Sequence, residues 1–317
     1  MRIYLTGGSG MVGSNLIKVA IERYEAKIFA PIHNWEPAEK VPFDYGRVDM
    51  CDRLEVQRTV RAFRPDAIVH CAILSGQPLM YRERKLAWQS YVEATRYLAE
   101  AASEVGAKMV LVSTDWVFDG TQAPADETTP PNPINYYGVL KVVGETLIGS
   151  LSKNWAVARV ASVNGIYWAQ PDRPVQQTMG MGNFMRVTVE ELRKNRSFIA
   201  WEGGVNTTVT PGLATDVGEM IIKIIKLDRV GIFHCCCGEG VSRLELARKT
   251  AEEFGFDPAW VRPGPCDPAY METVRGIPVP RDTRLNASFT AEQLRHPLLD
   301  VKDAIRQLHK QMETGTL

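Results

Sequence analysis

Short apolar runs alternate with amphipathic segments through the first half of the chain. The runs predict buried strands, which are expected at residues 2–5, 26–32, 66–72 and 108–112, with a further short strand ending near Val48. A helix is expected from Trp88 to Val105, and Gly106 supplies its stop. This alternation, with nearly continuous apolar strands, predicts an α/β fold built on a doubly wound parallel sheet.

The second half of the chain shows the same two patterns less regularly. Strands are predicted at 155–162 and 231–237, and the second of these is expected to return to the main sheet. Helices are predicted at 184–195, 216–227, 242–254 and 300–312. Turn and loop composition marks Asn164–Gly165 and the segments 121–135 and 261–280, while 167–182 is expected to form a flexible lid.

One stretch of the chain carries residue types suited to acid–base chemistry. A predicted strand ends at Thr114, and a helix expected over 136–151 carries Tyr137 and Lys141 on one face, four residues apart. An ammonium beside a phenol favours the phenolate, so the pKa of Tyr137 is expected to fall from about 10. With Thr114 holding a substrate oxygen, the set suits carbonyl reduction or alcohol oxidation. An isolated Tyr–Lys pair is more often an ordinary exposed pair.

Three glycines near the N-terminus predict a place for a dinucleotide. Gly7, Gly10 and Gly13 follow a strand and open a helix, whose free N–H groups and positive dipole end suit a pyrophosphate. The alternative is a glycine turn that binds no nucleotide. In doubly wound sheets ligands bind at the carboxyl ends of the strands, where this turn, segment 70–72 and Thr114 are all expected to meet.

The choice between the two nicotinamide dinucleotides is only weakly indicated. An acidic residue for the adenosine ribose is expected near the end of the second strand, but the chain there reads Ala30-Pro31-Ile32-His33-Asn34. The missing acid mildly favours NADP(H) over NAD(H), although no arginine for a 2′-phosphate is present in that run either. Asp49 is placed to meet an adenine edge, or it is a solvated turn residue.

Composition narrows the class of protein further. The chain has 37 Lys+Arg and 37 Asp+Glu in 317 residues, so bulk charge gives no reason to expect nucleic-acid or membrane-surface binding. The cysteines form no zinc pattern, no metal site is expected, and Cys235-Cys236-Cys237 is expected on a buried strand. No signal peptide and no run long enough to span a membrane are visible, so a soluble, cytoplasmic protein is expected.

Together these segments resemble the extended short-chain dehydrogenase/reductases that act on nucleotide sugars. The segment 113–120, Ser-Thr-Asp-Trp-Val-Phe-Asp-Gly, is similar to the Ser-Thr-Asp-Tyr-Val-Phe-Asp-Gly of the dTDP-4-dehydrorhamnose reductase branch and of its relative, the methionine adenosyltransferase β subunit. The segments 6–13, 135–145, 182–184, 210–211 and 280–285 resemble further motifs of that branch. One departure is Tyr91, which aligns where the family often has an asparagine supporting the lysine.

The resemblance implies a Rossmann domain, residues 1–165 with 216–240 returning to it, and a smaller C-terminal substrate-binding domain made of 166–215 and 241–317. It implies that Thr114, Tyr137 and Lys141 are catalytic. The cofactor-binding residues it implies are Gly7, Gly10, Met11, Val12, Gly13, Asp49, Met50, Cys71, Ala72, Tyr137 and Lys141. The substrate-binding residues it implies are Asp115, Trp116, Asn183, Arg281 and Arg284, although arginines are also common on surfaces.

The activity that the resemblance implies is NAD(P)H-dependent reduction of a nucleotide-linked 4-keto-6-deoxysugar. Dehydratases of the superfamily place an Asp-Glu pair after the threonine, whereas here Asp115 is followed by Trp116, which favours reduction. Two alternatives stay open: an epimerase acting on a similar substrate, and a cofactor-binding regulatory subunit like the adenosyltransferase β subunit. A homodimer is possible in any of these cases.

Overall fold

A computed structural model describes residues 1–33, 35–37, 40–74, 77–173, 175, 182–202, 207–265 and 276–317. Its main feature is a seven-stranded sheet in the order β11-β6-β5-β4-β1-β2-β3, with every neighbouring pair parallel. The strands are β1 (Arg2–Thr6), β2 (Lys27–Ile32), β3 (Asp44–Arg47), β4 (Ala67–His70), β5 (Lys108–Thr114), β6 (Trp155–Val160) and β11 (Gly231–Cys235). The prediction of a doubly wound parallel sheet is confirmed.

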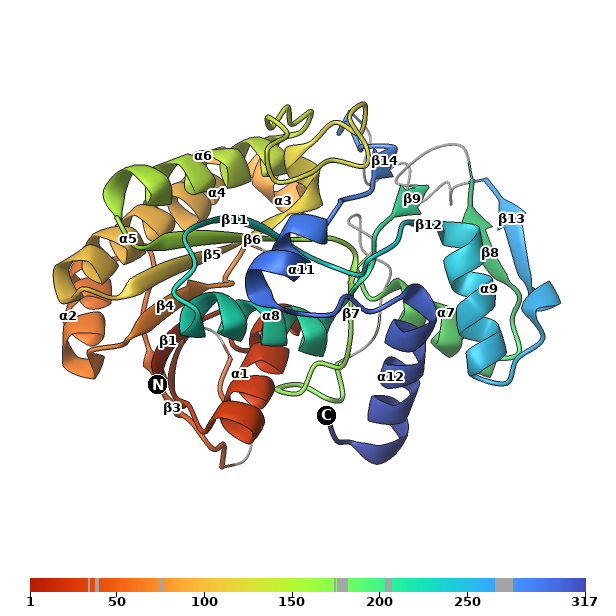
Figure 1. Ribbon diagram of the computed structural model, residues 1–317, viewed down its shortest axis with the longest axis horizontal. Coiled ribbons are helices and arrows are strands. Elements are labelled where there is room, and N and C mark those ends of the chain that lie inside the picture. The colour runs from red at the N-terminus through yellow and green to blue at the C-terminus, as the bar shows by residue number, and fades with distance from the viewer. Residues whose placement is uncertain are drawn as a thin grey trace.

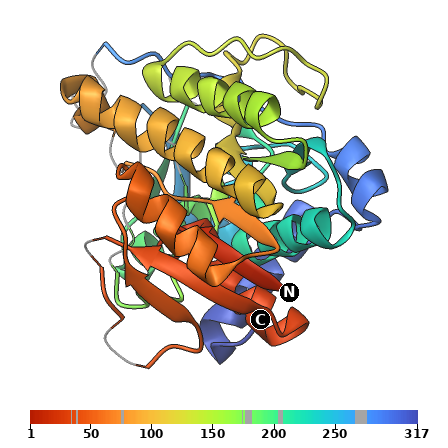
Figure 2. The same cartoon turned by 90° about the vertical axis from the view of Figure 1, so that its left-hand side faces the viewer.

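Helices cover both faces of this sheet. On one face α1 (Met11–Tyr24) packs against α8 (Ala214–Lys226), and the other face carries α2 (Arg53–Phe63), α5 (Ala94–Val105) and α6 (Tyr136–Leu151). Figure 2 shows the second layer in front of the sheet. Each layer buries its own apolar cluster, one around Leu5 and Leu16 and the other around Ile68 and Leu98.

The strand that follows α8 returns to the sheet, as the apolar pattern predicts. β11 pairs with β6 in parallel, from Gly231 opposite Ala156 to Cys235 opposite Val160. Cys235, Cys236 and Cys237 are all buried, as expected, but the strand predicted to run to Cys237 ends at Cys235. The chain therefore leaves the sheet after β6, passes through the C-terminal part, and returns to add α8 to one helical layer and β11 to the sheet (Figure 1).

A smaller C-terminal part lies beside the sheet (Figure 1, right). Its strands are β7 (Val163–Asn164), β8 (Phe198–Trp201), β9 (Thr208–Val209), β10 (Gly212–Leu213), β12 (Val241–Ser242), β13 (Val261–Gly264) and β14 (Asp282–Thr283). Its main helices are α7 (Phe184–Arg193), α9 (Arg243–Glu253) and α12 (Val301–Thr314). α11 (Ser288–Leu294) connects this part back to β11. A separate apolar cluster that includes Phe184, Leu246 and Ile305 holds these elements together.

Three details differ from the sequence-based expectations. The helix expected from Trp88 is made of α4 (Arg84–Trp88), a π-helical turn (Gln89–Glu93) and α5, after a short α3 (Gln77–Arg82). Asn164 lies on β7, which pairs with β10, rather than in a turn. Part of the predicted loop 261–280 is a strand, because β13 pairs with β8; residues 266–275 lie outside the described part of the chain.

Helix ends follow the capping signals in the sequence. Asp52 caps α2 by accepting from the backbone N–H groups of Leu54 and Glu55, and Ser242 caps α9 by accepting from Glu245. Gly106 ends α5 in the left-handed conformation. Two short 3-10 turns, Asp115–Val117 and Pro258–Trp260, complete the described helical structure.

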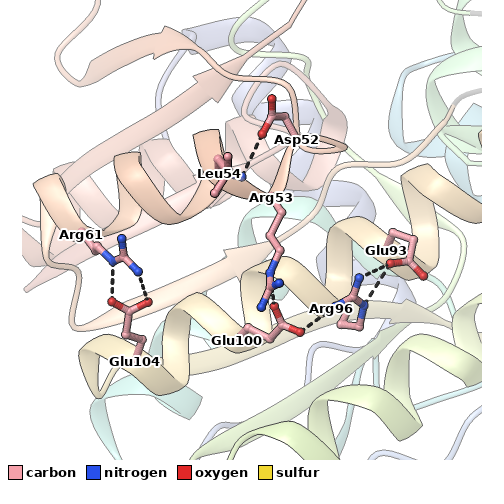
Figure 3. A network of polar contacts seen from close by, with 8 residues as sticks. All are labelled: Asp52, Arg53, Leu54, Arg61, Glu93, Arg96, Glu100 and Glu104. Carbon is pink, nitrogen blue, oxygen red and sulfur yellow. Dashed lines mark hydrogen bonds and ion pairs between the residues drawn. The ribbon is translucent and has the colours of Figure 1, made fainter.

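Ion pairs on the surface connect α2 to α5 (Figure 3). Arg53 pairs with Glu100, and Arg61 pairs with Glu104. Arg96 pairs with Glu93 of the preceding π-helical turn and with Glu100 on its own helix. These side chains are partly or largely exposed to solvent, so each pair contributes little to stability, about 0–1 kcal/mol.

Candidate active site

In the turn between β1 and α1, the backbone at Gly7 closely approaches that at Gly10 and Gly13. Gly10 N donates to Gly7 O at 2.9 Å, and a Cβ on Gly13 would lie 2.2 Å from the same oxygen. Gly10 is the N-cap of α1 and supplies no side-chain cap, so the first N–H groups of a 14-residue helix lack a side-chain acceptor. This geometry fits a pyrophosphate, which backbone donors and the helix dipole would hold.

The end of β4 lies directly against this turn. Thr6 Oγ1 accepts from Ala72 N at 3.1 Å and lies 2.7 Å from His70 Nδ1, and a Cβ on Gly7 would lie 2.7 Å from Ala72 N. Burial and the nearby Lys141 lower the pKa of His70 to about 3, so its ring is neutral. The structure therefore brings Cys71 and Ala72 to the glycine turn, where they were expected.

The start of α6 is held against the turn that follows β5. Asn135 caps the helix by accepting from Gly138 N at 2.9 Å. A Cβ on Gly138 would lie 2.3 Å from Trp116 O, so only glycine allows this close approach. As a result Tyr137 meets the end of β5, where the nearby Thr114 hydroxyl acts to lower the pKa of its phenol.

Lys141 is buried one helical turn beyond Tyr137. Its Nζ donates to Val112 O at 2.9 Å and lies 6.0 Å from the centroid of the Tyr137 ring. Burial lowers the pKa of Lys141 to about 8, while Cys71 and Glu145 act in the opposite direction. The predicted set of Thr114, Tyr137 and Lys141 is thus brought together at the carboxyl edge of the sheet.

The expected effect of Lys141 on the phenol is wrong for this structure. Burial raises the pKa of Tyr137 to about 12, Asp115 acts in the same direction, and the nearby Thr114 hydroxyl opposes both. Lys141 does not offset the burial because its ammonium is turned toward the Val112 carbonyl. The phenol is therefore protonated throughout the neutral range, as a proton donor has to be.

Asp115 and Trp116 belong to the 3-10 turn that follows Thr114 and contacts α6. Thr114 Oγ1 donates to Asp115 Oδ1 at 2.9 Å, and the Asp115 residue is only 4% exposed. Burial raises the pKa of this carboxyl to about 6, against the lowering effects of Thr283, Thr114 and Arg243. The indole of Trp116 packs edge-on against Tyr137, with ring centroids 6.2 Å apart. Substrate contact by either residue stays a prediction.

The other expected substrate residues lie in the C-terminal part. Asn183, at the start of α7, is buried and its side chain accepts from Gly165 N at 3.1 Å. Arg284 forms an ion pair with Asp282 at 2.8 Å, and Arg281 is exposed. A Cβ on Gly120 would lie 2.6 Å from Asp282 O, so segment 281–284 adjoins the end of segment 113–120. Residues 174 and 176–181 of the expected lid lie outside the described residues.

The remaining expected cofactor residues occupy the same edge. Met11 and Val12 form the first turn of α1 and are half-buried. Asp49 accepts from Cys51 N at 2.8 Å in the turn before α2, and Met50 packs against the apolar cluster below. Their contact with a dinucleotide stays a prediction.

Three features of the site are not apparent from the sequence. The fully buried Arg159 on β6 forms a two-point ion pair with Glu145 at 3.1 and 2.7 Å, and only the Glu145 motif hints at it. The π-helical turn places the Tyr91 ring 5.9 Å from that of Tyr137. Strand pairing sets Arg47 beside Ile32 at the end of β2, a position that no local pattern reveals.

Among the described residues no group of three or more metal-ligating side chains could hold an ion, and no helix is long and apolar enough to cross a membrane. The glycine turn and the Thr–Tyr–Lys set, placed at one edge of a doubly wound sheet, define a protein of the short-chain dehydrogenase/reductase class. Comparison with known sequences gives the family: residues 1–314 match the model of the RmlD substrate binding domain, and the chain belongs to this family.

Two kinds of protein are similar to this chain: a deoxysugar-nucleotide reductase and a methionine adenosyltransferase subunit. The chain is 28% identical to a dTDP-4-keto-6-deoxy-D-glucose reductase of Streptomyces niveus, over 84% of this chain and 83% of that protein. It is 26% identical to the methionine adenosyltransferase 2 subunit beta of Bos taurus, over 90% of this chain and 80% of that protein. The fold matches a dTDP-4-dehydrorhamnose reductase from Bacillus anthracis str. Ames, solved in complex with NADP, with a TM-score of 0.79, 22% identity and 98% of both chains covered.

Proposed function

We propose that this protein reduces the keto group of a nucleotide-linked 4-keto-6-deoxysugar with NAD(P)H. The observation that carries the proposal is the placement of the protonated Tyr137 phenol close to Thr114 at the end of β5, on the sheet edge shared with the glycine turn. A dinucleotide bound at that turn would supply the hydride. The similarity to a reductase of Streptomyces niveus supports the choice of a sugar nucleotide as substrate.

In this mechanism the residues of the chain hold the substrate and move one proton. Thr114 and Tyr137 would hold the keto oxygen between two hydroxyls. Tyr137 would protonate the oxygen as hydride reaches the carbon, a transfer that typically contributes 10²–10⁴-fold, as an order of magnitude. Lys141, charged below about pH 8, would attract the negative charge that forms on the phenol. Trp116 stands where a dehydratase would have its second carboxylate, so elimination lacks a base.

The proposal is tested by NADPH and NADH consumption with a dTDP-4-keto-6-deoxyhexose. Tyr137→Phe is expected to lose turnover by about 10²–10⁴-fold while its affinity for the dinucleotide, measured by fluorescence titration, is kept. Tyr136→Phe is the matched control, because the neighbouring hydroxyl bonds to Arg84 O outside the proposed site. Equal turnover in wild type and Tyr137→Phe would remove Tyr137 as the proton donor.

NADP(H) is the cofactor we favour, and Arg47 supports the choice. Arg47 lies beside the end of β2, and its Nε and Nη2 both donate to Oε1 of Glu36, at 3.0 and 2.8 Å. A 2′-phosphate would be an alternative acceptor for this exposed guanidinium. Arg47→Gln is expected to weaken NADPH binding about tenfold, the effect of losing ~1.4 kcal/mol, and to leave NADH binding unchanged. Arg53→Gln, on the nearby α2, is the control; an equal loss for both dinucleotides contradicts the assignment.

A second candidate function is that of a cofactor-binding regulatory subunit. It is favoured by the similarity to methionine adenosyltransferase 2 subunit beta over 90% of the chain. Tight dinucleotide binding, no turnover of any keto sugar nucleotide and co-purification with a synthetase partner would support it. An epimerase would instead exchange solvent deuterium into a ring carbon of the sugar without net consumption of the dinucleotide.

A further inference from the structure

The first turn of α7 contains buried hydrogen-bond donors that have no acceptor in the described part of the chain. Nε and Nη1 of Arg186 are covered from solvent, and neither has a hydrogen-bond partner there. Nδ2 of Asn183, which begins the helix and is 4% exposed, also lacks a partner among these residues. A buried donor without an acceptor is costly, and more so when it carries a charge. These three nitrogen atoms therefore indicate that a ligand supplies an acceptor.

The charges around Arg186 favour an anion as that ligand. Glu190, one helical turn further along α7, acts on Arg186, but its carboxylate forms an ion pair with Arg193 at 3.3 Å. Tyr167 also lies near Arg186, and the guanidinium carbon of Arg173 is 4.6 Å from the centre of the Tyr167 ring. Burial lowers the pKa of Arg186, yet a guanidinium stays charged at neutral pH. One carboxylate among three guanidinium groups leaves the surroundings of Arg186 positive.

Two sets of contacts place the start of α7 beside the glycine turn and the acid–base residues. Gly165 N donates to the side chain that begins α7, at 3.1 Å, and a Cβ on Gly165 would lie 3.2 Å from Met11 Sδ in α1. The Phe184 ring, in the first turn of α7, lies 5.0 Å from the guanidinium carbon of Arg243, whose charge acts on Asp115. A ligand at this turn of α7 is therefore close to the site of the proposed reduction.

Arg186 lies on the side of α7 that is open to solvent. Arg186, Glu190 and Arg193 are three to four residues apart and share one side of the helix. Exposure increases along this side, from the half-buried Arg186 and Glu190 to the exposed Arg193. The opposite side carries Phe184 and Leu192, which belong to the apolar cluster of the C-terminal part. A ligand can thus reach Arg186 from solvent without disturbing that cluster.

We propose that Arg186 and Asn183 bind the diphosphate of the nucleotide-linked sugar, with Arg186 as the charged residue of the site. The inference rests on the proposed function, because the nucleotide-linked sugar is what brings a diphosphate to this place. Phosphate oxygens accept charge-assisted hydrogen bonds from a guanidinium, and these are stronger than neutral ones. In a nucleotide-linked 4-keto sugar the diphosphate is attached across the ring from the keto carbon. One end of the sugar would then be held at α7 while its keto oxygen meets Tyr137.

Binding measured without turnover tests the assignment. Isothermal titration with dTDP, UDP and GDP identifies the nucleoside diphosphate that wild type binds most tightly, and NADPH is titrated beside it. Arg186→Gln is expected to lose about 10–100-fold in affinity for that nucleoside diphosphate, the effect of losing a charge-assisted hydrogen bond, and to bind NADPH as wild type does. Arg196→Gln is the matched control, because Arg196 is exposed and pairs with Glu191.

Three results of this titration would overturn the proposal. The first is an affinity for the nucleoside diphosphate that is the same in Arg186→Gln and wild type. The second is a loss of NADPH affinity in its place, which would assign Arg186 to the phosphates of the dinucleotide. The third is wild-type protein that binds none of the three nucleoside diphosphates.

Unfolding of the ligand-free protein separates a ligand-binding role of Arg186 from a structural one. Arg186→Met removes a partly buried cation that lacks an acceptor, so the urea concentration at the midpoint of unfolding is expected to rise. The nucleoside diphosphate should raise this midpoint further in wild type and much less in the variant. A lower midpoint in ligand-free Arg186→Met would show that the guanidinium stabilises the fold, and would overturn the proposal.

Turnover distinguishes failure of this assignment from failure of the reductase function. With a keto sugar nucleotide that wild type reduces, Arg186→Gln is expected to raise KM about tenfold and to change kcat less, because the diphosphate lies away from the reacting carbon. An unchanged KM would overturn the role of Arg186 and leave the reductase function standing. Diphosphate binding that depends on Arg186, in a protein that reduces no keto sugar, would support the site and contradict the reductase function.

Discussion

Individual charged side chains in this protein have very different energetic roles, which depend on burial. Lys141 is 5% exposed and has an ammonium whose pKa burial lowers to about 8. Glu145 and Arg159 are buried as a pair, whereas Glu104 and Arg61 form an exposed pair. The same kind of substitution at these places is therefore expected to give different results.

Replacing the buried lysine should stabilise the protein while removing function. In Lys141→Met the folded state no longer carries a buried cation, so the free energy of unfolding at pH 7 should rise by about 1–3 kcal/mol after the lost bond to Val112 O is included. In wild type the unfolded chain binds the extra proton between pH 8 and 10.5, so stability rises through that window and the gap narrows. Urea unfolding at pH 7 and pH 10 measures the difference in free energy of unfolding between Lys141→Met and wild type. A difference that is the same at both pH values would contradict the lowered pKa of Lys141.

Breaking the buried ion pair should destabilise the protein strongly. Glu145→Gln leaves Arg159 without a charged partner in the core, which costs about 3–5 kcal/mol. Glu104→Gln is the matched control, since its pair with Arg61 is exposed and contributes about 0–1 kcal/mol. Chemical denaturation measures the free energy of unfolding of both variants. Comparable losses of stability in the two would mean that water reaches Arg159 and hydrates its charge.

The sequence is informative about these residues and less so about their energetics. Residue types and spacing are enough to select Thr114, Tyr137 and Lys141, which the structure brings together. The pKa of Tyr137 moves opposite to the predicted direction, because a four-residue spacing fixes the helix face but not the direction of the ammonium. Arg159 escapes prediction because a single arginine on an apolar strand carries no local signal for its partner.

At the level of elements, the close contact between α6 and the turn after β5 sets the geometry of the site. A Cβ on Gly138 would meet Trp116 O at 2.3 Å, whereas a Cβ on Gly149, in the same helix, would touch the Trp155 ring at an ordinary 3.4 Å. Replacement by alanine is therefore expected to have opposite effects on stability at these two glycines.

Gly138→Ala should push α6 away from Thr114. Overpacking of this kind costs about 1–3 kcal/mol, and displacement of Tyr137 by ~1 Å is expected to lower turnover about 10²-fold. Gly149→Ala should stabilise the helix by about 0.5–1 kcal/mol and leave turnover unchanged. Thermal unfolding and the keto-sugar assay report both effects; normal turnover in Gly138→Ala would show that the helix does not need this approach.

Element boundaries show where sequence patterns stop being informative. The helix over 136–151 has its predicted ends, and in the structure Asn135 caps its N-terminus by accepting from Gly138 N. β13 escapes prediction because Pro263 marks a loop, yet the strand pairs with β8 through its other groups. The π-helical turn at 89–93 is not foreseeable, because one extra residue in a turn leaves the apolar period almost unchanged.

At the scale of the whole molecule, neither part is made of one continuous segment. α8 covers α1 and β11 extends the sheet beside β6, although both follow the first strands of the C-terminal part. β14 and α11 then return beside β9 and β11. This exchange of segments explains why the sheet is predictable from local patterns while the C-terminal part, with its strands of two to four residues, is predictable only in outline.

The exchange of segments predicts a single unfolding transition. Far- and near-ultraviolet circular dichroism should follow one common curve in urea, because neither part can keep its core when the other unfolds. The fragment 1–165 is the control: without α8 and β11 it exposes the cluster around Leu16 and should bind a hydrophobic dye. Two separate transitions, or a stably folded fragment, would contradict this interdependence.

Because the cysteine run 235–237 is buried, the rate at which its thiols react can report local unfolding of the returning segment. Cys235 ends the edge strand β11, Cys236 and Cys237 follow it, and all three are buried; burial raises the pKa of each thiol far above its usual value. A disulfide reagent should therefore label the half-buried Cys51 first and these three only when the last strand detaches. The slow phase of labelling by this reagent then reports how often the returning segment leaves the sheet.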